Sequence, residues 1–545
     1  MNSYDYIVVG SGAAGCVLAA RLSENPNNKV LLLEAGNERR HPLLSIPVGE
    51  VLLMGNSKYD WCFQTEPDPT LNNRRLTIPR GRLLGGSNAI NGMIYVKGQP
   101  EDYDSWEAEG NPGWRWDDVV PYFRRLERAE QFNHPSRGKE GPIHVELPQE
   151  TDTLCDAFLA AAQACGHPLN ADYNAGDQEG VGYYQATQQG GVRSSARGQY
   201  LRAARNRPNL HVRTNALVTK LRIQDGRCSG VSFLQQGDLI HVESKRDTIL
   251  SAGVIQSPQL LELSGIGRPD VLENAGIRPL HALNDVGENF RDHYSCRLKW
   301  RVNRPITFNE RTRGISLLGE ISKYALSRKG VLSLPIALTF AFLRSSPAET
   351  RPDLQYHFAP ASYGPGSTRR LDTKPGMTLG LYPLRPESKG SIHITSSDPV
   401  RPPSIQPRFL DDPNDLRRLV LGMKLAREII HQDPIAQYCV EELSPSRKIT
   451  SDEALMEYVR EHGDTSYHPV GTCRMGCDED AVVDHRLRVR GVKGLRVIDA
   501  SIMPTMVSGN TNAATLMIAE KGAAMVLEDA AKPNENTEKS LVREV

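Results

Sequence analysis

The sequence feature that most restricts the fold of this chain is a glycine-rich turn close to its start, Gly10-Ser11-Gly12-Ala13-Ala14-Gly15. The turn follows a short β-branched stretch, residues 6–9, and leads into residues 13–22, which are rich in Ala and Leu and have the period of a helix. Residues 29–33 have the composition of a second buried strand. This order predicts a βαβ unit whose glycines allow a tight turn and let the backbone approach a pyrophosphate at the helix N-terminus.

An acidic residue supports this interpretation. Glu34 ends the second predicted strand, about 20 residues beyond the glycines, where a carboxylate can accept hydrogen bonds from an adenosine ribose. Turn, strand and acid together predict a dinucleotide site; the alternative is an ordinary strand-to-helix turn with a surface Glu. The turn does not by itself distinguish FAD from NAD.

Composition restricts the other partners. The 545 residues include 65 Lys and Arg against 65 Asp and Glu, so the net charge is zero and argues against a nucleic-acid partner. Nine Cys, an odd number in a long chain, favour a reducing compartment over a disulfide framework. The polar start carries no secretory signal pattern. We therefore expect a cytoplasmic protein, with peripheral contact at the inner membrane face left open.

The longest apolar stretch, residues 331–343, is interrupted by Ser333, Pro335 and Thr339 and is too short to cross a bilayer. We interpret it as a buried strand; a membrane-docking patch is the alternative. Residues 353–358, 377–382 and 391–395 also resemble strands and predict a mainly antiparallel sheet. Helical periods occur at residues 154–164, 415–430, 451–461 and 513–527, whereas residues 37–113 are predicted to be extended loops.

Longer segments resemble the signatures of the glucose–methanol–choline (GMC) oxidoreductase family. Residues 79–91, Pro-Arg-Gly-Arg-Leu-Leu-Gly-Gly-Ser-Asn-Ala-Ile-Asn, are similar to its first signature, and residues 251–267 are similar to its second. Shorter similarities at residues 286–293, 466–472 and 497–501 follow in family order, so the resemblance covers nearly the whole chain.

The resemblance implies an α/β composite fold, with a Rossmann-like FAD-binding domain and a discontinuous substrate domain built on an antiparallel sheet flanked by helices. We expect the FAD domain to comprise residues 1–150, 190–297 and 466–530, and the substrate domain residues 151–189 and 298–465. Residues 531–545 are a polar tail that we expect to be disordered.

One FAD per chain is implied, and it should be non-covalent. Some relatives attach the flavin through a His immediately before the Asn of the first signature, and this chain has Ile90 there. Asn91 would be a neutral donor near the polar edge of the ring. The residues expected at the cofactor are Gly10, Gly12, Ala13, Ala14, Gly15, Glu34, Ala35, Arg80, Leu84, Gly85, Gly86, Ser87, Asn88, Asn91, Gly92, Met93, Ile94, Val218, Ala252, Gly253, Asp499, Ala500, Asn510 and Thr511.

Two residues match the family's catalytic positions. His468 would take the hydroxyl proton of an alcohol while flavin N5 receives the hydride, a role that suits an imidazole because its ordinary pKa is near neutrality. Asn510 would donate its amide N–H to the substrate oxygen, with Asn512 as the alternative for this role.

The expected substrate pocket includes Trp61, Leu338, Phe340 and Tyr467. Residues 334–342 carry no acid, whereas choline would favour a buried carboxylate. We therefore expect neutral, apolar primary alcohols, aliphatic or aromatic, to be oxidised to aldehydes, with electrons passing to a quinone or carrier more readily than to O2.

Other functions stay open at this stage. Within the family, a choline, polyol or polyether dehydrogenase or an alcohol oxidase is the alternative. From other classes, a redox-silent FAD lyase of the hydroxynitrile type, an NAD-dependent dehydrogenase and a non-catalytic flavin-binding protein are possible. The oligomeric state is not predicted.

Two further patterns could suggest a function other than alcohol oxidation. His468, Cys473, Cys477 and His485 lie within one short segment, but their irregular spacing is a poor fit to zinc, and we expect no metal. Five arginines could suggest nucleic acid, yet no aromatic platform accompanies them, and we expect a solvated, ion-paired face. They are Arg193, Arg197, Arg202, Arg205 and Arg207.

Overall fold

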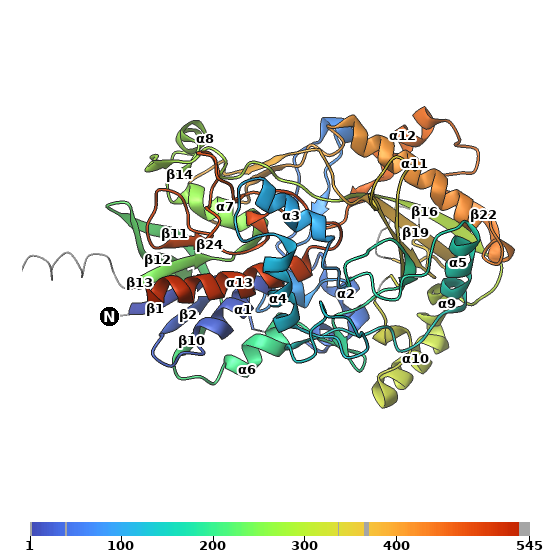
Figure 1. Ribbon diagram of the computed structural model, residues 1–545, viewed down its shortest axis with the longest axis horizontal. Coiled ribbons are helices and arrows are strands. Elements are labelled where there is room, and N and C mark those ends of the chain that lie inside the picture. The colour runs from blue at the N-terminus through green and yellow to red at the C-terminus, as the bar shows by residue number, and fades with distance from the viewer. Residues whose placement is uncertain (1–2, 39–40, 336, 365–369, 533–545) are drawn as a thin grey trace, which may run out of the picture.

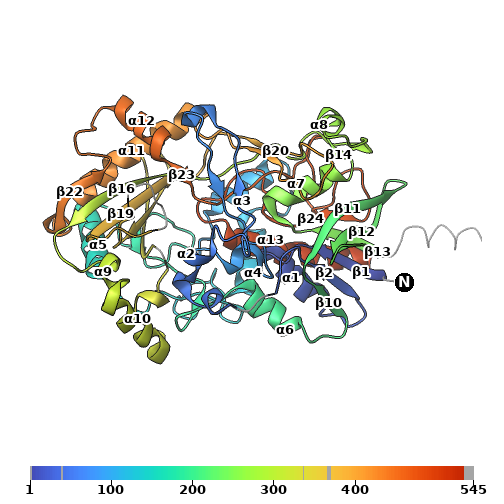
Figure 2. The ribbon, with the colours of Figure 1, turned by 180° about the vertical axis from the view of Figure 1, so that it is seen from behind.

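The computed structural model describes residues 3–38, 41–335, 337–364 and 370–532. The chain forms two seven-stranded sheets. They lie in opposite halves of the molecule, as Figure 1 and, from behind, Figure 2 show. The predicted disordered tail falls outside the described residues from residue 533 onward. The expectation of an α/β composite fold with an antiparallel second sheet is confirmed.

The first sheet carries the βαβ unit predicted from the glycine turn. Strand β1 pairs in parallel with β2 on one side and with β13 on the other. All four residues of β2, Val-Leu-Leu-Leu, are buried, as expected for a parallel strand covered on both faces. The strands of this sheet are β1 (Ser3–Val9), β2 (Val30–Leu33), β10 (Leu210–Arg213), β11 (Ala216–Gln224), β12 (Arg227–Gln235), β13 (Asp238–Leu250) and β24 (Leu495–Val497).

Two helices far apart in sequence cover this sheet together. Helix α1 (Ala13–Leu22) begins directly at the glycine turn, and α13 (Asn512–Ala531) lies against it. A Cβ added at Gly522 of α13 would come within 2.6 Å of Ile498, the residue after β24, so this glycine lets α13 lie close to the sheet. The end of the chain is thereby brought to the cofactor-binding turn at its start.

The second sheet is antiparallel, in the order β22-β16-β19-β18-β17-β7, with β23 paired to β16. Helix α11 (Pro413–Ile430) lies against β19. Its strands are β7 (Gly180–Tyr183), β16 (Tyr294–Val302), β17 (Thr339–Leu343), β18 (Leu354–Ala359), β19 (Gly376–Pro383), β22 (Cys439–Ser444) and β23 (Asp464–Thr465). The strands of the two sheets come from alternating segments of the chain, as a discontinuous substrate domain requires; the exact domain boundaries stay a prediction.

Three expectations about local structure need correction. Within residues 331–343 only β17 is a strand, since Val331–Ser333 forms a 3₁₀ turn. The predicted strand at residues 391–395 is β20 (Ser391–His393), which pairs with β21 (Ser404–Gln406) outside the main sheet. Residues 37–113 are not loops throughout, because helix α3 (Pro100–Ala108) begins there at a Pro after a capping box of Gln99 and Asp102.

The remaining elements complete the two halves. The other helices are α2 (Glu50–Leu53), α4 (Trp116–Leu126), α5 (Thr153–Ala164), α6 (Arg202–Ala204), α7 (Gly253–Leu263), α8 (Pro269–Asn274), α9 (Phe308–Arg311), α10 (Gly314–Ser327) and α12 (Asp452–His462). Short strand pairs are β3 (Phe63–Gln64) with β4 (Thr77–Ile78), β5 (Glu127–Arg128) with β6 (Ile143–His144), β8 (Gln188–Gln189) with β9 (Val192–Arg193), and β14 (Ile266–Gly267) with β15 (His281–Ala282). Among the described residues, no helix has both the length and the apolar character needed to cross a bilayer.

Candidate active site

One continuous cavity runs from the glycine turn to the loop that carries His468. At the first end it is lined by Gly10, Gly12 and the start of α1, and at the other by His468 and Asn510. It therefore connects the predicted dinucleotide site with the predicted catalytic residues.

Two glycines of the turn, Gly10 and Gly15, leave no room for a side chain. Gly10 has φ of +93°, and a Cβ there would lie 2.6 Å from the Ser251 carbonyl oxygen. A Cβ at Gly15 would lie 1.8 Å from the Gly10 carbonyl oxygen, so this glycine is needed for packing. Gly12 faces open space and has no capping side chain, which leaves the first N–H groups of α1 available to a phosphate.

Glu34 lies on the cavity wall, where it also braces the turn. Its carboxylate accepts hydrogen bonds from the Ser11 hydroxyl (2.6 Å), the Ser11 N–H (3.0 Å) and the Gly36 N–H (2.7 Å). Burial raises the pKa of Glu34, and these three donors oppose that shift. A carboxylate has more acceptor sites than three bonds use, so a ribose hydroxyl can still bind here.

Most of the residues expected at the cofactor line this cavity, but three do not. Gly15 packs against the turn, Leu84 is in the core with 1% of its surface exposed, and Gly85 forms a left-handed turn beside Arg197. The expected residues that do line it are Gly10, Gly12, Ala13, Ala14, Glu34, Ala35, Arg80, Gly86, Ser87, Asn88, Asn91, Gly92, Met93, Ile94, Val218, Ala252, Gly253, Asp499, Ala500, Asn510 and Thr511.

Two of these residues are fixed by their own contacts. Asn91 accepts a hydrogen bond from Arg193 (2.8 Å) through its Oδ1, which leaves its Nδ2 as a donor. Asp499 accepts from the Gly253 N–H (2.9 Å) and the Ser257 hydroxyl (2.6 Å), and so ties β24 to the start of α7. Asn91 is thereby fixed at the predicted flavin end of the cavity. Asp499 fixes the loop that follows β24 against the start of α7.

At the reactive end, His468 and Asn510 lie side by side. The Nδ2 of Asn510 is 3.0 Å from Nε2 of His468. Asn512, the alternative candidate, instead uses its side-chain oxygen to accept from Asn88 (3.0 Å). Of the two asparagines, Asn510 is therefore the one beside the predicted base.

A second histidine determines the tautomer of the first. The Nε2 of His293 is 2.9 Å from the Leu384 carbonyl oxygen, which can only accept, so this nitrogen carries a proton. Burial lowers the pKa of His293 to about 4, so the ring is neutral and its Nδ1 is an acceptor. That Nδ1 lies 3.1 Å from Nδ1 of His468.

The proton between the two Nδ1 atoms therefore belongs to His468. Its Nε2 then carries the lone pair, which accepts from Asn510 beside the cavity that both residues line. Burial, followed by the neighbouring His293 and His357, lowers the pKa of His468 well below its ordinary value. His468 is thus a neutral base at physiological pH.

The backbone of His468 is anchored separately. Its N–H donates to Oδ1 of Asp292 (2.8 Å), and the Thr465 hydroxyl donates to Oδ2. Tyr467 has a left-handed backbone (φ of +66°), and its carbonyl accepts from Arg80 (2.6 Å). Burial raises the pKa of Asp292 to about 7. These contacts hold a strained loop in the conformation that aims the imidazole.

Asn510 is oriented by the second sheet. Gln355 on β18 donates its Nε2 to Oδ1 of Asn510 (3.1 Å) and to the Tyr184 hydroxyl (2.8 Å). The Tyr382 hydroxyl donates to Oε1 of Gln355 (2.7 Å), and its ring stacks on His293 with centroids 4.4 Å apart. Because Oδ1 of Asn510 is engaged, its N–H groups face His468.

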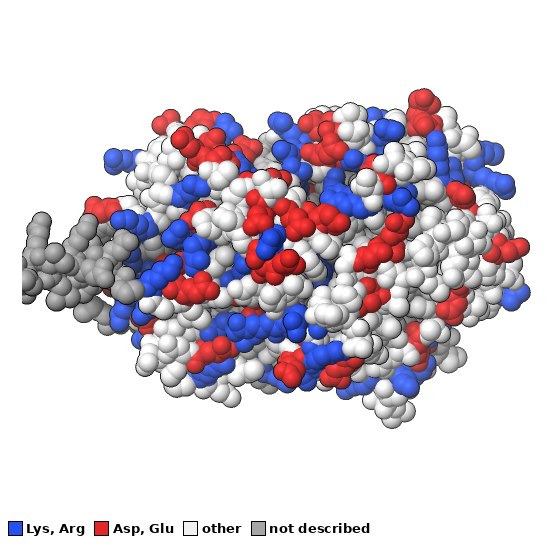
Figure 3. Space-filling model, viewed as in Figure 1, with Lys and Arg blue, Asp and Glu red and all other residues white. Residues whose placement is uncertain are grey.

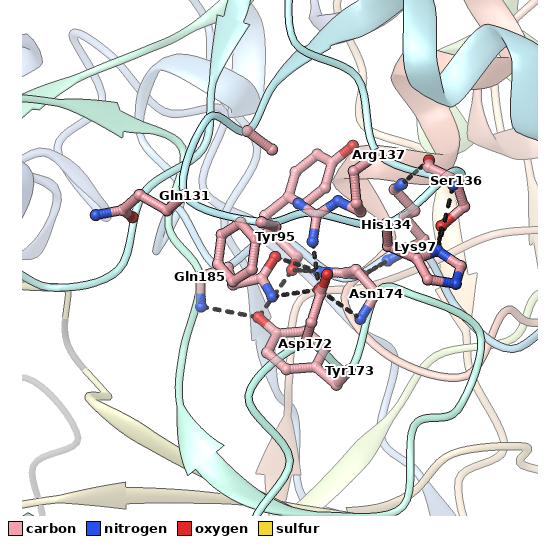
Figure 4. A network of polar contacts seen from close by, with 12 residues as sticks. Tyr95, Lys97, Gln131, His134, Ser136, Arg137, Asp172, Tyr173, Asn174 and Gln185 are labelled. Atoms are coloured by element: carbon pink, nitrogen blue, oxygen red, sulfur yellow. Dashed lines mark hydrogen bonds and ion pairs between the residues drawn. The ribbon is translucent and has the colours of Figure 1, made fainter.

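Figure 4 shows a network of polar contacts around the buried side chains of Lys97 and Arg137. Lys97 and Arg137 share the carboxylate of Glu127 at 2.8 and 3.1 Å, and Arg137 also contacts Asp172. Burial lowers the pKa of Lys97 to about 8, although its ion pair opposes the shift. The Gln185 amide then links Asp172 to the strand that precedes Tyr184.

The four residues expected in the substrate pocket divide into two pairs. Trp61 and Tyr467 line the cavity. Leu338 and Phe340 are fully buried and do not line it, so their placement there needs correction. Phe340 packs against Tyr184, which stands between it and the Gln355–Asn510 contact.

The structure also describes the two patterns that suggested a metal site and a nucleic-acid surface. Within the described ranges, no group of three or more His, Cys, Asp or Glu side chains is arranged to hold a metal, and Cys473 is in the core. The expectation of a solvated arginine face is wrong for Arg193, which is buried in an ion pair with Glu50 at 2.7 Å. Arg205 pairs with Glu38 in a half-exposed position.

Several residues of this site had no role assigned from the sequence. Asp292 and His293 lie within a segment that carried the family resemblance, but only the fold shows that they face His468. Gln355 and Tyr382 lie on predicted strands of the second sheet, and no local pattern marks them.

Comparisons with known proteins found similar sequences and structures. Residues 4–295 and 386–519 match the N-terminal and C-terminal domains of the family described as GMC oxidoreductase. An alcohol dehydrogenase (acceptor) from Pseudomonas putida is 40% identical over 531 residues, covering 96% of this chain and 96% of that protein. An oxygen-dependent choline dehydrogenase from Photobacterium profundum is 40% identical over 532 residues, covering 96% and 93%. The crystal structure of pyridoxine 4-oxidase from Mesorbium loti superposes with a TM-score of 0.88 at 31% identity, covering 96% of this chain and 99% of that one.

Proposed function

The chain belongs to the GMC oxidoreductase family, and from this premise we propose that it is an FAD-dependent enzyme that oxidises neutral, apolar primary alcohols to aldehydes. The observation that carries the proposal is the pair formed by His468 and Asn510, which places an unprotonated imidazole nitrogen and an amide N–H donor side by side at one cavity. Oxidising a CH–OH group requires a base for the hydroxyl proton and a donor that fixes the oxygen.

The cavity fits an FAD. The glycine turn and the start of α1 suit the pyrophosphate, Glu34 suits the ribose, and Asn91 suits the polar edge of a flat ring. When bound, FAD supplies the acceptor for the hydride of the carbinol carbon. Ile90 is buried among Leu53, Tyr59 and Leu83 and offers no nucleophile, which supports non-covalent binding.

The protein's own groups handle the proton. An alcohol oxygen that binds beside the two side chains and replaces their direct contact accepts an N–H from Asn510 and donates its proton to Nε2 of His468. The imidazolium that forms keeps its Nδ1–H on Nδ1 of His293, so the charge develops on an already oriented ring. Gln355 prevents Asn510 from rotating, because it occupies the amide oxygen.

Charges around the cavity favour a neutral alcohol over choline. Its lining carboxylates, Glu34 and Asp499, are already engaged with local donors. Arg80 lies on the wall near Tyr467 and would repel a quaternary ammonium. The Trp61 ring is covered by the Arg82 guanidinium at 4.5 Å and stacks on Phe63 at 5.8 Å, so its faces are used.

A kinetic comparison tests the substrate class. We expect kcat/KM for 1-hexanol and benzyl alcohol to exceed that for choline by at least about a hundredfold, the cost of burying an unpaired cation. Choline dehydrogenation is the second candidate because a relative bears that name. A larger kcat/KM for choline would refute our substrate assignment, and cyanide release from cyanohydrins without alcohol oxidation would indicate a lyase.

We also propose that the reduced enzyme passes electrons to a quinone or carrier. The test measures the rate of alcohol oxidation with a soluble quinone under nitrogen and compares it with the rate in air without quinone. Faster turnover with the quinone agrees with the proposal, whereas stoichiometric H2O2 at an equal or greater rate would identify an oxidase.

A further inference from the structure

Helix α10 (Gly314–Ser327) is unusual because its apolar side faces outward. Four of the ten large apolar residues that are exposed in the described part of the chain lie on it. They are Ile315 (88% exposed), Leu318 (64%), Ile321 (46%) and Leu326 (89%). Only Tyr324 of this helix is buried, and its hydroxyl donates to the Gly191 carbonyl (3.0 Å).

Helical geometry places Ile315, Leu318 and Leu326 on one face, with Ile321 at its edge. Ile315 and Leu326 are eleven residues apart, about three turns, and therefore point the same way. Tyr324 follows Ile315 by nine residues, about two and a half turns, so the buried side and the apolar stripe are opposite. Figures 1 and 2 both show α10 projecting from the second half of the molecule. Figure 3 shows its tip as a mainly uncharged surface.

Positive charge prevails around the helix, although Lys323 is paired with Glu150 at 2.7 Å. Residues 310–329 hold five Lys or Arg and two Glu, a net charge of +3 in a chain whose total is zero. Glu310 caps α9, and Glu320 is bound to Arg311 (2.8 Å) and the Val331 N–H (2.8 Å). Neither Glu therefore opposes an anionic surface.

Cations flank the stripe at both ends. Arg313 precedes the helix, and Arg328 and Lys329 follow it. None of the three is in an ion pair with a carboxylate of the described ranges; Arg313 donates to the Leu371 carbonyl, and Arg328 lies over the Tyr324 ring at 5.1 Å. An exposed helix with an apolar stripe between cationic ends has the chemistry of an interfacial helix.

We propose that α10 docks the protein on an anionic lipid bilayer, with Ile315, Leu318 and Leu326 entering the boundary between headgroups and acyl chains. A second copy of the chain is a poorer occupant, because two-fold pairing of the stripe would bring two clusters of net charge +3 together. The apolar stripe of the helix is available to a bilayer, because the contacts of α10 with the protein are made by other residues: Tyr324 is buried, Glu320 is bound to Arg311 and Lys323 to Glu150. This inference goes beyond the proposed function and does not depend on it.

Flotation of the full-length holoenzyme with lipid vesicles tests the proposal. The vesicles are phosphatidylcholine alone or with about 30% phosphatidylglycerol. We expect binding to the anionic vesicles, a partition coefficient at least about tenfold lower for the Ile315→Ser/Leu318→Ser/Leu326→Ser variant, and severalfold lower for Arg328→Gln/Lys329→Gln. The matched control, Leu239→Ser/Val440→Ser, removes apolar side chains of similar exposure elsewhere and should bind as the parent does.

Flavin content and alcohol oxidation with a soluble acceptor should be unchanged in all these variants, because every substituted side chain is on the surface. Absence of binding to anionic vesicles, or equal binding by the triple-serine variant, would overturn the proposal. Concentration-dependent self-association that the triple-serine substitution abolishes, without vesicle binding, would assign the stripe to a second copy instead.

Discussion

Replacing His293 with Leu tests whether this residue fixes the tautomer of the base. The change removes the acceptor 3.1 Å from Nδ1 of His468 and leaves that N–H buried without a partner. An unsatisfied buried donor costs about 1–3 kcal/mol. The bond to His293 strengthens when His468 becomes charged, so we expect most of this cost in the transition state, as a fall in kcat of about 5- to 160-fold. KM should change little, because His293 does not line the cavity.

His293→Asn is the matched control. Its Oδ1 can take the place of the imidazole Nδ1 and accept from His468, while the Leu384 carbonyl loses its donor in both variants. Steady-state kinetics per bound flavin should therefore show a loss of less than about tenfold for Asn, with the larger loss for Leu. Equal losses in kcat for the two variants, or an unimpaired Leu variant, would refute the tautomer argument and leave His293 a packing role.

Three further results are expected. Because burial lowers the pKa of His468 and only the neutral ring is a base, kcat/KM should stay level as pH falls through neutrality and decline only below about pH 6.5; a decline at higher pH would contradict this. Asn510→Ala should lower kcat by about 100- to 1,000-fold, whereas Asn512→Ala, which loses a contact to another side chain, should cost less than about tenfold; the reverse order in steady-state assays would exchange their roles. Lys97→Met should leave Glu127 with a single cation and destabilise the fold by about 3 kcal/mol, seen as a lower thermal midpoint; an unchanged midpoint would mean that the buried pair contributes nothing net.

The residues that line the glycine-turn end of the cavity were predicted from the sequence because the glycines themselves record the backbone constraints there. Gly10 needs a positive φ and Gly15 needs an absent Cβ, and both requirements come from neighbours within a few residues or from the adjacent strand. The predicted helix at residues 13–22 coincides with α1. Helix α3 was not predicted because only a narrow side of it, which includes Tyr103 and Trp106, is buried, so its apolar residues show little helical period. The Pro at its start is also common in loops.

The reactive end was predicted only in part because its contacts join distant segments. His293 and His468 are 175 positions apart, and Gln355 and Asn510 are 155 apart, so no spacing rule relates them. Phe340, in contrast, was predicted to line the substrate pocket and does not line the cavity. Strand β17 is buried on both faces, so alternation of side chains cannot tell which residues reach the cavity and which pack one layer behind it.

The most direct test of the central claim is the visible spectrum of the purified protein before and after anaerobic addition of 1-hexanol. We expect flavin bands that bleach with the alcohol in the parent protein, and intact bands in His468→Ala, since loss of the base should slow reduction by at least about a hundredfold. Bleaching that is equally fast in His468→Ala would show that His468 is not the base. A protein that neither carries nor takes up FAD would contradict the account as a whole.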